Sequence, residues 1–374
     1  MSDTKKKNRI ERYVYKKLTS EKSSRDSERH HMLTFEEQEK LKRIKFFTFL
    51  KAGFTGAFAI IILYIPYYIW PEWFPDTQLW IPLMDAYYAV PLVFLMYSLV
   101  LVIIEIALLT LYNISAIKEI SQACSYPNPN DMNYESEVNS LVAVGLERKQ
   151  KGQSTLGINP FEGLPKYQVL TYTAFHLMKA ALTSFILKLI LGKLLGRYAL
   201  RIFVDLAGIP VYAFWNIWAA NGVMNETRIR VMAAPVIKDL SKELFSSQKD
   251  NDEFKNELYY ILDYIAIIKR TFHYSHYLLS ISMLKTFSTP IDPEHSYDPE
   301  FINRIKNGSK LTQAGFSKLL LFGMLVDGDL SRKEENLILK MHKNGYFSYT
   351  REQSKQWTND YFSGKGIEEL IDAQ

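Results

Sequence analysis

Two long apolar runs stand out from the otherwise polar first third of the chain. Residues 52–71 contain no charged side chain. A helix of about 20 apolar residues is long enough to cross the hydrocarbon core of a bilayer. Residues 86–104 are also uncharged, and the apolar character continues beyond Glu105. The pattern predicts a transmembrane helical hairpin with spans at about 46–70 and 86–112.

The residues that flank these runs predict where the first helix begins and how the hairpin is oriented. Thr34 and Glu37 have the spacing of a capping box, so we expect a helix to start at Thr34. Basic residues precede the first span at Lys40, Lys42, Arg43 and Lys45. The connection between the spans contains no Lys or Arg. Because basic residues are enriched in cytoplasmic loops, we predict that both termini are cytoplasmic.

A third apolar region, residues 167–225, has two interpretations. Its first part contains Lys179, Lys188 and Lys193, and its second part is uncharged from Leu206 to Asn225. A Lys at the centre of a membrane helix costs about 2.5–3.5 kcal/mol on insertion scales. The region therefore forms either two further spans or a helix pair that lies on the inner leaflet.

The rest of the chain is polar and lacks a convincing strand pattern. We expect a disordered basic tail over 1–33, although its first part could form an amphipathic helix on an anionic membrane. The segment 34–117 holds the first helix and the hairpin, and 118–166 is a polar cytoplasmic linker with one short helix. The segment 226–374 is expected to be a helical cytoplasmic domain. Its predicted helices cover about 252–287, 300–307, 311–325, 331–343 and 351–362. The predicted fold class is all-α.

The segment GRYALRIFVDLAGIPVYAFWNIWAANGVMNETRIRVM, residues 196–232, resembles the core pattern of EcsC-like bacterial proteins. That pattern is a basic helix end, an apolar segment with a Gly-x-Pro turn, a central Asn and an Arg-containing amphipathic helix. With the hairpin, it resembles uncharacterised bacterial multipass membrane proteins. The resemblance implies a bacterial cytoplasmic (inner) membrane and supplies no activity.

The segment LLLFGMLVDGDLSRKEENLIL, residues 319–339, resembles the turn of TerB-like helical domains and of EF-hands. With Glu334 at the last position of an EF-hand loop, Asp327 takes the fifth position. The first and third positions are then Gly323 and Leu325, which offer no side-chain oxygen. Calcium needs carboxylates from those positions. We therefore predict a helix–turn–helix rather than a calcium site.

Several residues of the apolar segments are candidates for a functional or structural role inside the membrane. Glu105 is an ionisable residue in an apolar span, and such residues mark ion pathways or polar pairs. Asn216 and Asn221 could hydrogen-bond across helices. Small residues on the first span, Gly53, Gly56 and Ala57, let another helix approach closely. That neighbour could be the second span or a second copy of the chain.

Composition and motifs limit the chemistry. The formal net charge of +5 is too weak to indicate nucleic acid, and the single cysteine excludes an internal disulfide and a multi-thiolate zinc site. No nucleotide-binding, hydrolase or metalloprotease signature is present. The weak metal candidates are His273, His276, Asp327 and Glu334. We predict no catalytic residue and no cofactor.

Three functions are compatible with this pattern. The favoured one is a membrane-anchored structural or interaction protein whose cytoplasmic helical region binds a protein partner. The second is a small transporter or channel subunit that uses Glu105 and the 167–225 helix pair and forms a homo-oligomer. The third is a membrane-bound enzyme with an unrecognised site.

Overall fold

The computed structural model describes residues 9–19, 33–81, 86–129, 134–146, 156–162, 164–165, 167, 169, 201–365 and 367–372. Within them the chain is mostly helical and divides into two compact units. We call the described residues of Met1–Leu18, Leu41–Ile120 and Leu170–Asn225 the anchor unit, and those of Thr19–Lys40, Ser121–Val169 and Glu226–Gln374 the helical domain. The first part of the predicted 167–225 helix pair lies outside the described residues.

The anchor unit is built on two long apolar helices, α2 (Phe35–Ile69) and α3 (Leu92–Ala123). The predicted start of α2 is confirmed, because the Thr34 amide donates to Glu37 Oε2 and the Glu37 amide donates to Thr34 Oγ1. The Tyr97 hydroxyl on α3 donates to the Ile62 carbonyl on α2. Among the described residues, these two helices have the length and composition needed to cross a membrane.

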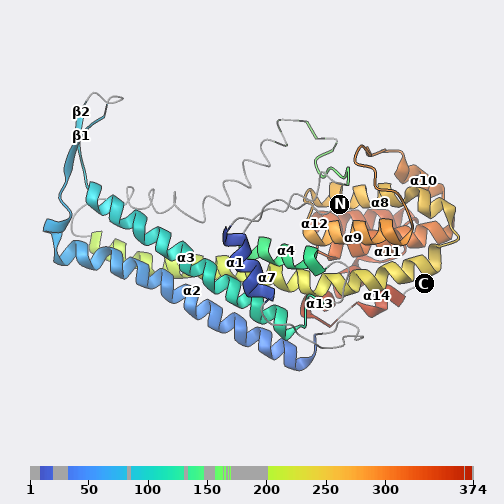
Figure 1. Cartoon of the computed structure of the whole chain (residues 1–374). Coiled ribbons are helices and arrows are strands. Elements are labelled where there is room, and N and C mark those ends of the chain that lie inside the picture. The colour runs from blue at the N-terminus through green and yellow to red at the C-terminus, as the bar shows by residue number, and fades with distance from the viewer. Residues whose placement is uncertain are drawn as a thin grey trace. The chain divides into compact units, whose positions relative to one another are not determined.

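The all-α prediction is confirmed for the described residues, apart from a β-hairpin that connects α2 to α3. A short 3-10 turn (Pro71–Trp73) leads to strands β1 (Thr77–Ile81) and β2 (Ala86–Val90), which pair antiparallel. Figure 1 shows the strands where α2 ends and α3 begins. The second long apolar helix therefore starts at Leu92, whereas the predicted second span starts at about residue 86. Proline disfavours helical backbone in the residue before it, so Pro91 separates the uncharged strand from the uncharged helix.

Two stretches of helix differ from the sequence prediction in where the helix is interrupted. Helix α7 (Arg201–Gln248) is continuous, so the expected Gly-x-Pro turn at Pro210 is absent. The predicted helix over 252–287 is instead two helices, α8 (Asp252–Lys269) and α9 (Tyr274–Thr286). Arg270 adopts left-handed backbone with φ of 52°, which stops α8.

The predicted tail and the predicted linker both contain helix, and α4 confirms the one short helix that was expected in the linker. Within the predicted disordered tail, α1 spans Arg9–Thr19, where apolar residues recur at helical spacing and Val14 is fully buried. Within the predicted linker, α3 continues to Ala123 and α4 spans Tyr134–Gly145. Helix α4 buries Val138, Leu141, Val142 and Val144, whereas α1 buries Val14 and leaves Ile10 and Tyr13 exposed. Packing of an apolar face stabilises helices as short as α4.

The helical domain surrounds α11, which is buried along most of its length. Its remaining helices are α10 (Phe301–Asn307), α11 (Lys310–Leu325), α12 (Arg332–Lys343), α13 (Arg351–Ser363) and α14 (Glu368–Asp372). These bounds confirm the four predicted helices after residue 300 to within one residue. Helix α11 packs on α8, and a Cβ added to Gly323 would lie only 2.4 Å from Ile265 Cδ1. The core forms where these two helices approach.

Candidate functional site

The small residues of α2 form a contact surface for the first half of α7. A Cβ added to Gly53 would lie 2.9 Å from Ile217 Cδ1, and one added to Gly56 would lie 2.8 Å from the Tyr212 carbonyl oxygen. Ala57 is half-buried at the edge of this surface. The helix that approaches Gly53 and Gly56 is α7, whereas the expected neighbour was the second span or a second copy of the chain.

Glu105 lies in the same packed region of the anchor unit. Its carboxylate Oε1 accepts a 2.8 Å hydrogen bond from Asn216 Nδ2, and the residue is only 5% exposed. A Cβ added to Gly56 would lie 2.7 Å from the same Asn216 nitrogen. The prediction of a hydrogen bond across helices is confirmed for Asn216. Because polar groups in an apolar medium need partners, this bond fixes α7 against α3 beside the glycine contact with α2.

The Asp-Gly turn between α11 and α12 holds a lysine that the sequence analysis missed. Lys269 Nζ lies 2.8 Å from Asp327 Oδ1 and 3.1 Å from Glu334 Oε1, and it donates to the Asp329 carbonyl at 2.7 Å. The Lys269 side chain is 5% exposed. These oxygens come from the fifth, seventh and last positions of the EF-hand alignment. The ammonium therefore takes the place among them that an EF-hand gives to its cation.

The turn itself is fixed by its backbone and its cap. Gly328 has φ of +80°, which favours glycine. Ser331 and Glu334 form the predicted capping box, in which the Ser331 amide donates to Glu334 Oε2 at 2.6 Å. Burial raises the pKa of Glu334, although Lys269 pulls it down. Glu334 thus both caps α12 and pairs with Lys269.

His273 and His276 use their ring nitrogens to begin α9. His273 Nδ1 accepts from the Ser275 amide, and His276 Nδ1 accepts from the His273 amide. His276 Nε2 then donates to the Gly323 carbonyl at 2.9 Å. Burial lowers the pKa of His276 to about 4, so this ring is neutral. Within the described residues, no three His, Cys, Asp or Glu side chains are grouped to hold a metal.

His273 Nε2 contacts Glu226 in a partly buried polar cluster at the start of the helical domain. Glu226 contacts His273 Nε2 at 2.7 Å and Arg230 at 2.6 Å. Burial acts to raise the pKa of Glu226, but the His273 hydrogen bond and the Arg230 charge hold it at about 2. Arg230 also donates to the Ser140 carbonyl on α4. The cluster binds α7, α4 and α9 together.

Asp263 on α8 is a buried acid, and among the described residues it lacks the well-formed hydrogen bonds that Glu226 receives. It is fully buried, and no well-formed hydrogen bond reaches either carboxyl oxygen from the described residues. His295 Nε2 lies 3.0 Å from Oδ2. Burial raises the pKa of Asp263 to about 8 and lowers the pKa of His295, so both groups are neutral at pH 7. A neutral pair avoids the cost of buried charge.

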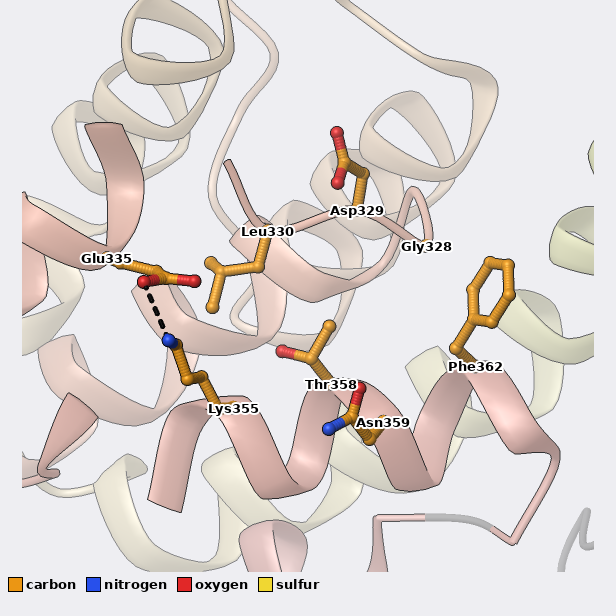
Figure 2. A pocket seen from close by; sticks show the side chains of 8 residues that line it. All are labelled: Gly328, Asp329, Leu330, Glu335, Lys355, Thr358, Asn359 and Phe362. Atoms are coloured by element: carbon orange, nitrogen blue, oxygen red, sulfur yellow. Dashed lines mark ion pairs between the residues drawn. The ribbon is translucent and has the colours of Figure 1, made fainter. Parts of the chain in front are cut away.

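A shallow groove of about 350 Å³ lies beside the Asp-Gly turn (Figure 2). It is lined by Gly328, Asp329 and Leu330 of the turn, Glu335 of α12, and Lys355, Thr358, Asn359 and Phe362 of α13. Lys355 Nζ pairs with Glu335 Oε2 at 3.1 Å across one end. The Phe362 side chain at the other end is 46% exposed. The groove combines an apolar ring with hydrogen-bonding groups, which suits a peptide segment.

Comparison of the chain with models of known protein families, with curated proteins and with solved structures gives no match.

Proposed function

We propose that this protein is a membrane-anchored interaction protein that holds a helical partner-binding domain at the inner face of a bacterial cytoplasmic membrane. The exposed apolar surface of α3 carries the proposal. Only 6% of its most apolar stretch is buried, and side chains such as Met96 and Ile103 are more than half exposed. Exposed apolar surface of this length needs lipid or another protein to cover it.

The helical domain supplies the binding function in this proposal. The groove between the Asp-Gly turn and α13 is the surface where we place the partner, because it offers an exposed Phe362 next to polar Thr358 and Asn359. A few residues, which are often aromatic, contribute most of the binding energy at protein interfaces. The turn is held rigid by Lys269, so the groove exists before a partner arrives.

The anchoring half of the proposal is tested with membranes from expressing cells. We expect the full chain to stay in the pellet after alkaline washing and to enter detergent. A reporter fused at Gln78 should be external, and a reporter after Gln374 should be cytoplasmic. Full-length protein in the supernatant without detergent, or a cytoplasmic reporter at Gln78, contradicts the proposal.

The binding half is tested by site-specific photo-crosslinking in intact cells. A crosslinker at Asn359 should give one discrete adduct, which mass spectrometry identifies, and Phe362→Ala should abolish it. A crosslinker at exposed Lys249 serves as the matched control in the same domain. No adduct at Asn359, or the same adducts from both positions, rejects the groove as the binding surface.

A transporter or channel subunit is the second candidate, and the contact between Glu105 and Asn216 favours it. This pair joins the carboxylate of α3 to α7, the two elements that a polar path through the anchor unit would require. In proteoliposomes, an ion or proton flux that Glu105→Gln abolishes would support this candidate. Equal flux in the wild type, in Glu105→Gln and in protein-free vesicles would reject it.

A further inference from the structure

Helix α1 has two faces of different character. Val14 is fully buried, so one face of the helix is packed into the protein. The exposed side chains are Arg9, Ile10, Arg12, Tyr13 and Lys16; Arg12 and Lys16 lie opposite Val14, and Ile10 lies one turn before it. Ile10 and Tyr13 are each more than half exposed. Basic side chains and large apolar side chains therefore share one surface.

The composition of α1 suits an anionic surface rather than open solvent. The helix contains four basic residues and one acidic residue. Helices that lie in the headgroup layer of a membrane combine Lys and Arg with embedded aromatic and aliphatic side chains. Tyrosine is enriched at this depth because its ring is apolar and its hydroxyl is polar. The exposed face of α1 has each of these features.

The same unit contains the point where α2 changes from polar to apolar. Lys42 and Arg43 are exposed just before Phe46 and Phe47, whose side chains are also exposed. A basic collar next to aromatic residues marks the boundary between headgroups and hydrocarbon. Helix α1 and this part of α2 belong to the same compact unit. We therefore expect both basic segments to meet the same lipid surface.

We infer that the exposed face of α1 binds the phosphate groups of anionic lipids in the cytoplasmic leaflet, with Arg9, Arg12 and Lys16 as the contacting cations and Ile10 and Tyr13 inserted between headgroups. This inference rests on the proposed membrane anchoring. It assigns a lipid class to the anchor and makes the docking of α1 dependent on salt and on lipid charge.

The experiment uses the full chain in nanodiscs, with an environment-sensitive fluorophore on α1. Cys124 is the only cysteine, so Cys124→Ser with Ile10→Cys places one label. Discs of phosphatidylcholine alone are compared with discs that also contain phosphatidylglycerol. We expect a blue-shifted signal, quenched by brominated lipid, in the anionic discs. High salt should reverse it.

Charge removal tests the assignment of the three cations. Each basic residue near an anionic surface favours binding about five-fold, so Arg9→Gln, Arg12→Gln and Lys16→Gln together should lower the ratio of docked to free α1 about a hundred-fold. The matched control removes three exposed charges of the helical domain, Lys249, Lys333 and Lys343, and should have no effect.

The outcomes separate this inference from the function on which it rests. An equal signal in both kinds of disc, or a signal that survives removal of the three charges, overturns the lipid inference and leaves the anchor intact. Failure of the unlabelled protein to enter any disc overturns the anchor and the lipid inference together. Helix content from circular dichroism shows whether each variant is folded.

Discussion

Helices α3 and α11 are both apolar in sequence, yet they have opposite surroundings in the structure. In α11 the residues from Phe316 to Leu325 are all buried beneath neighbouring helices of the domain. In α3 a large set of apolar side chains remains exposed, including Leu95, Met96 and Ile103. Apolar residues of the same kinds thus serve a protein core in one region and an outward surface in the other.

The two regions differ in what covers their apolar side chains. The helical domain buries them with its own helices, so it gains the hydrophobic free energy of folding in water. In the anchor unit, the described residues leave much of α3 exposed, and in the proposed function lipid covers that surface. Its helices contact one another through close packing at Gly53 and Gly56 and through the hydrogen bond from Asn216 to Glu105.

The largest expected effect is on the core of the helical domain. Phe316→Ala removes a fully buried ring and should lower the free energy of unfolding by about 3–5 kcal/mol. The matched truncation on the exposed face of α3, Ile103→Ala, should change it by less than about 0.5 kcal/mol. Denaturant unfolding of both variants in detergent measures this. Equal losses would remove the contrast between the regions.

The buried charges of the Asp-Gly turn should be nearly as sensitive. Lys269→Met leaves Asp327 and Glu334 without their cation, and we expect a loss of about 3 kcal/mol in thermal or denaturant unfolding. Adding Glu334→Gln removes one uncompensated charge, so the double variant should recover part of the loss. A double variant less stable than Lys269→Met would argue against charge as the cause.

Close packing in the anchor unit should discriminate between its two glycines. Gly56→Ala meets the Tyr212 backbone and the Asn216 amide and should cost about 1–3 kcal/mol. Gly53→Ala meets only the tip of the flexible Ile217 side chain and should cost less than about 1 kcal/mol. Thermal unfolding in detergent tests the order of the two variants. A more harmful Gly53→Ala would contradict the placement of α7.

The smallest effect is expected at Asp263, and it depends on pH. The pKa of this carboxyl is raised from 3.8 to about 8, so its contribution to stability is full below pH 3.8 and is lost as pH rises towards 8. Asp263→Asn carries no such penalty and should stabilise the protein by about 1–2 kcal/mol at pH 7. The gain should disappear near pH 4. A variant whose stability tracks the wild type at every pH would show that Asp263 does not titrate in this range.

Much of the fold followed from local patterns, because helix starts and apolar periodicity depend on residues that are close in sequence. The capping boxes at Thr34 and Ser331 and the four helices after residue 300 are of this kind. The two short strands were not predicted, because an uncharged segment such as Ala86–Val90 suits either a helix or a strand. The prediction that His273 and His276 share one helix face was wrong, because His273 precedes α9 rather than lying within it.

The sequence by itself determined the two apolar helices, the basic collar and the polar or small residues within apolar segments, Gly56, Glu105 and Asn216. Only the tertiary structure decided that these three residues meet, and that Lys269 lies inside the Asp-Gly turn. Asn216 follows Glu105 by 111 positions, and the Lys269 ammonium donates to the Asp329 carbonyl, which lies 60 positions further along the chain. Such contacts depend on how whole helices pack, and no short stretch of sequence contains that information.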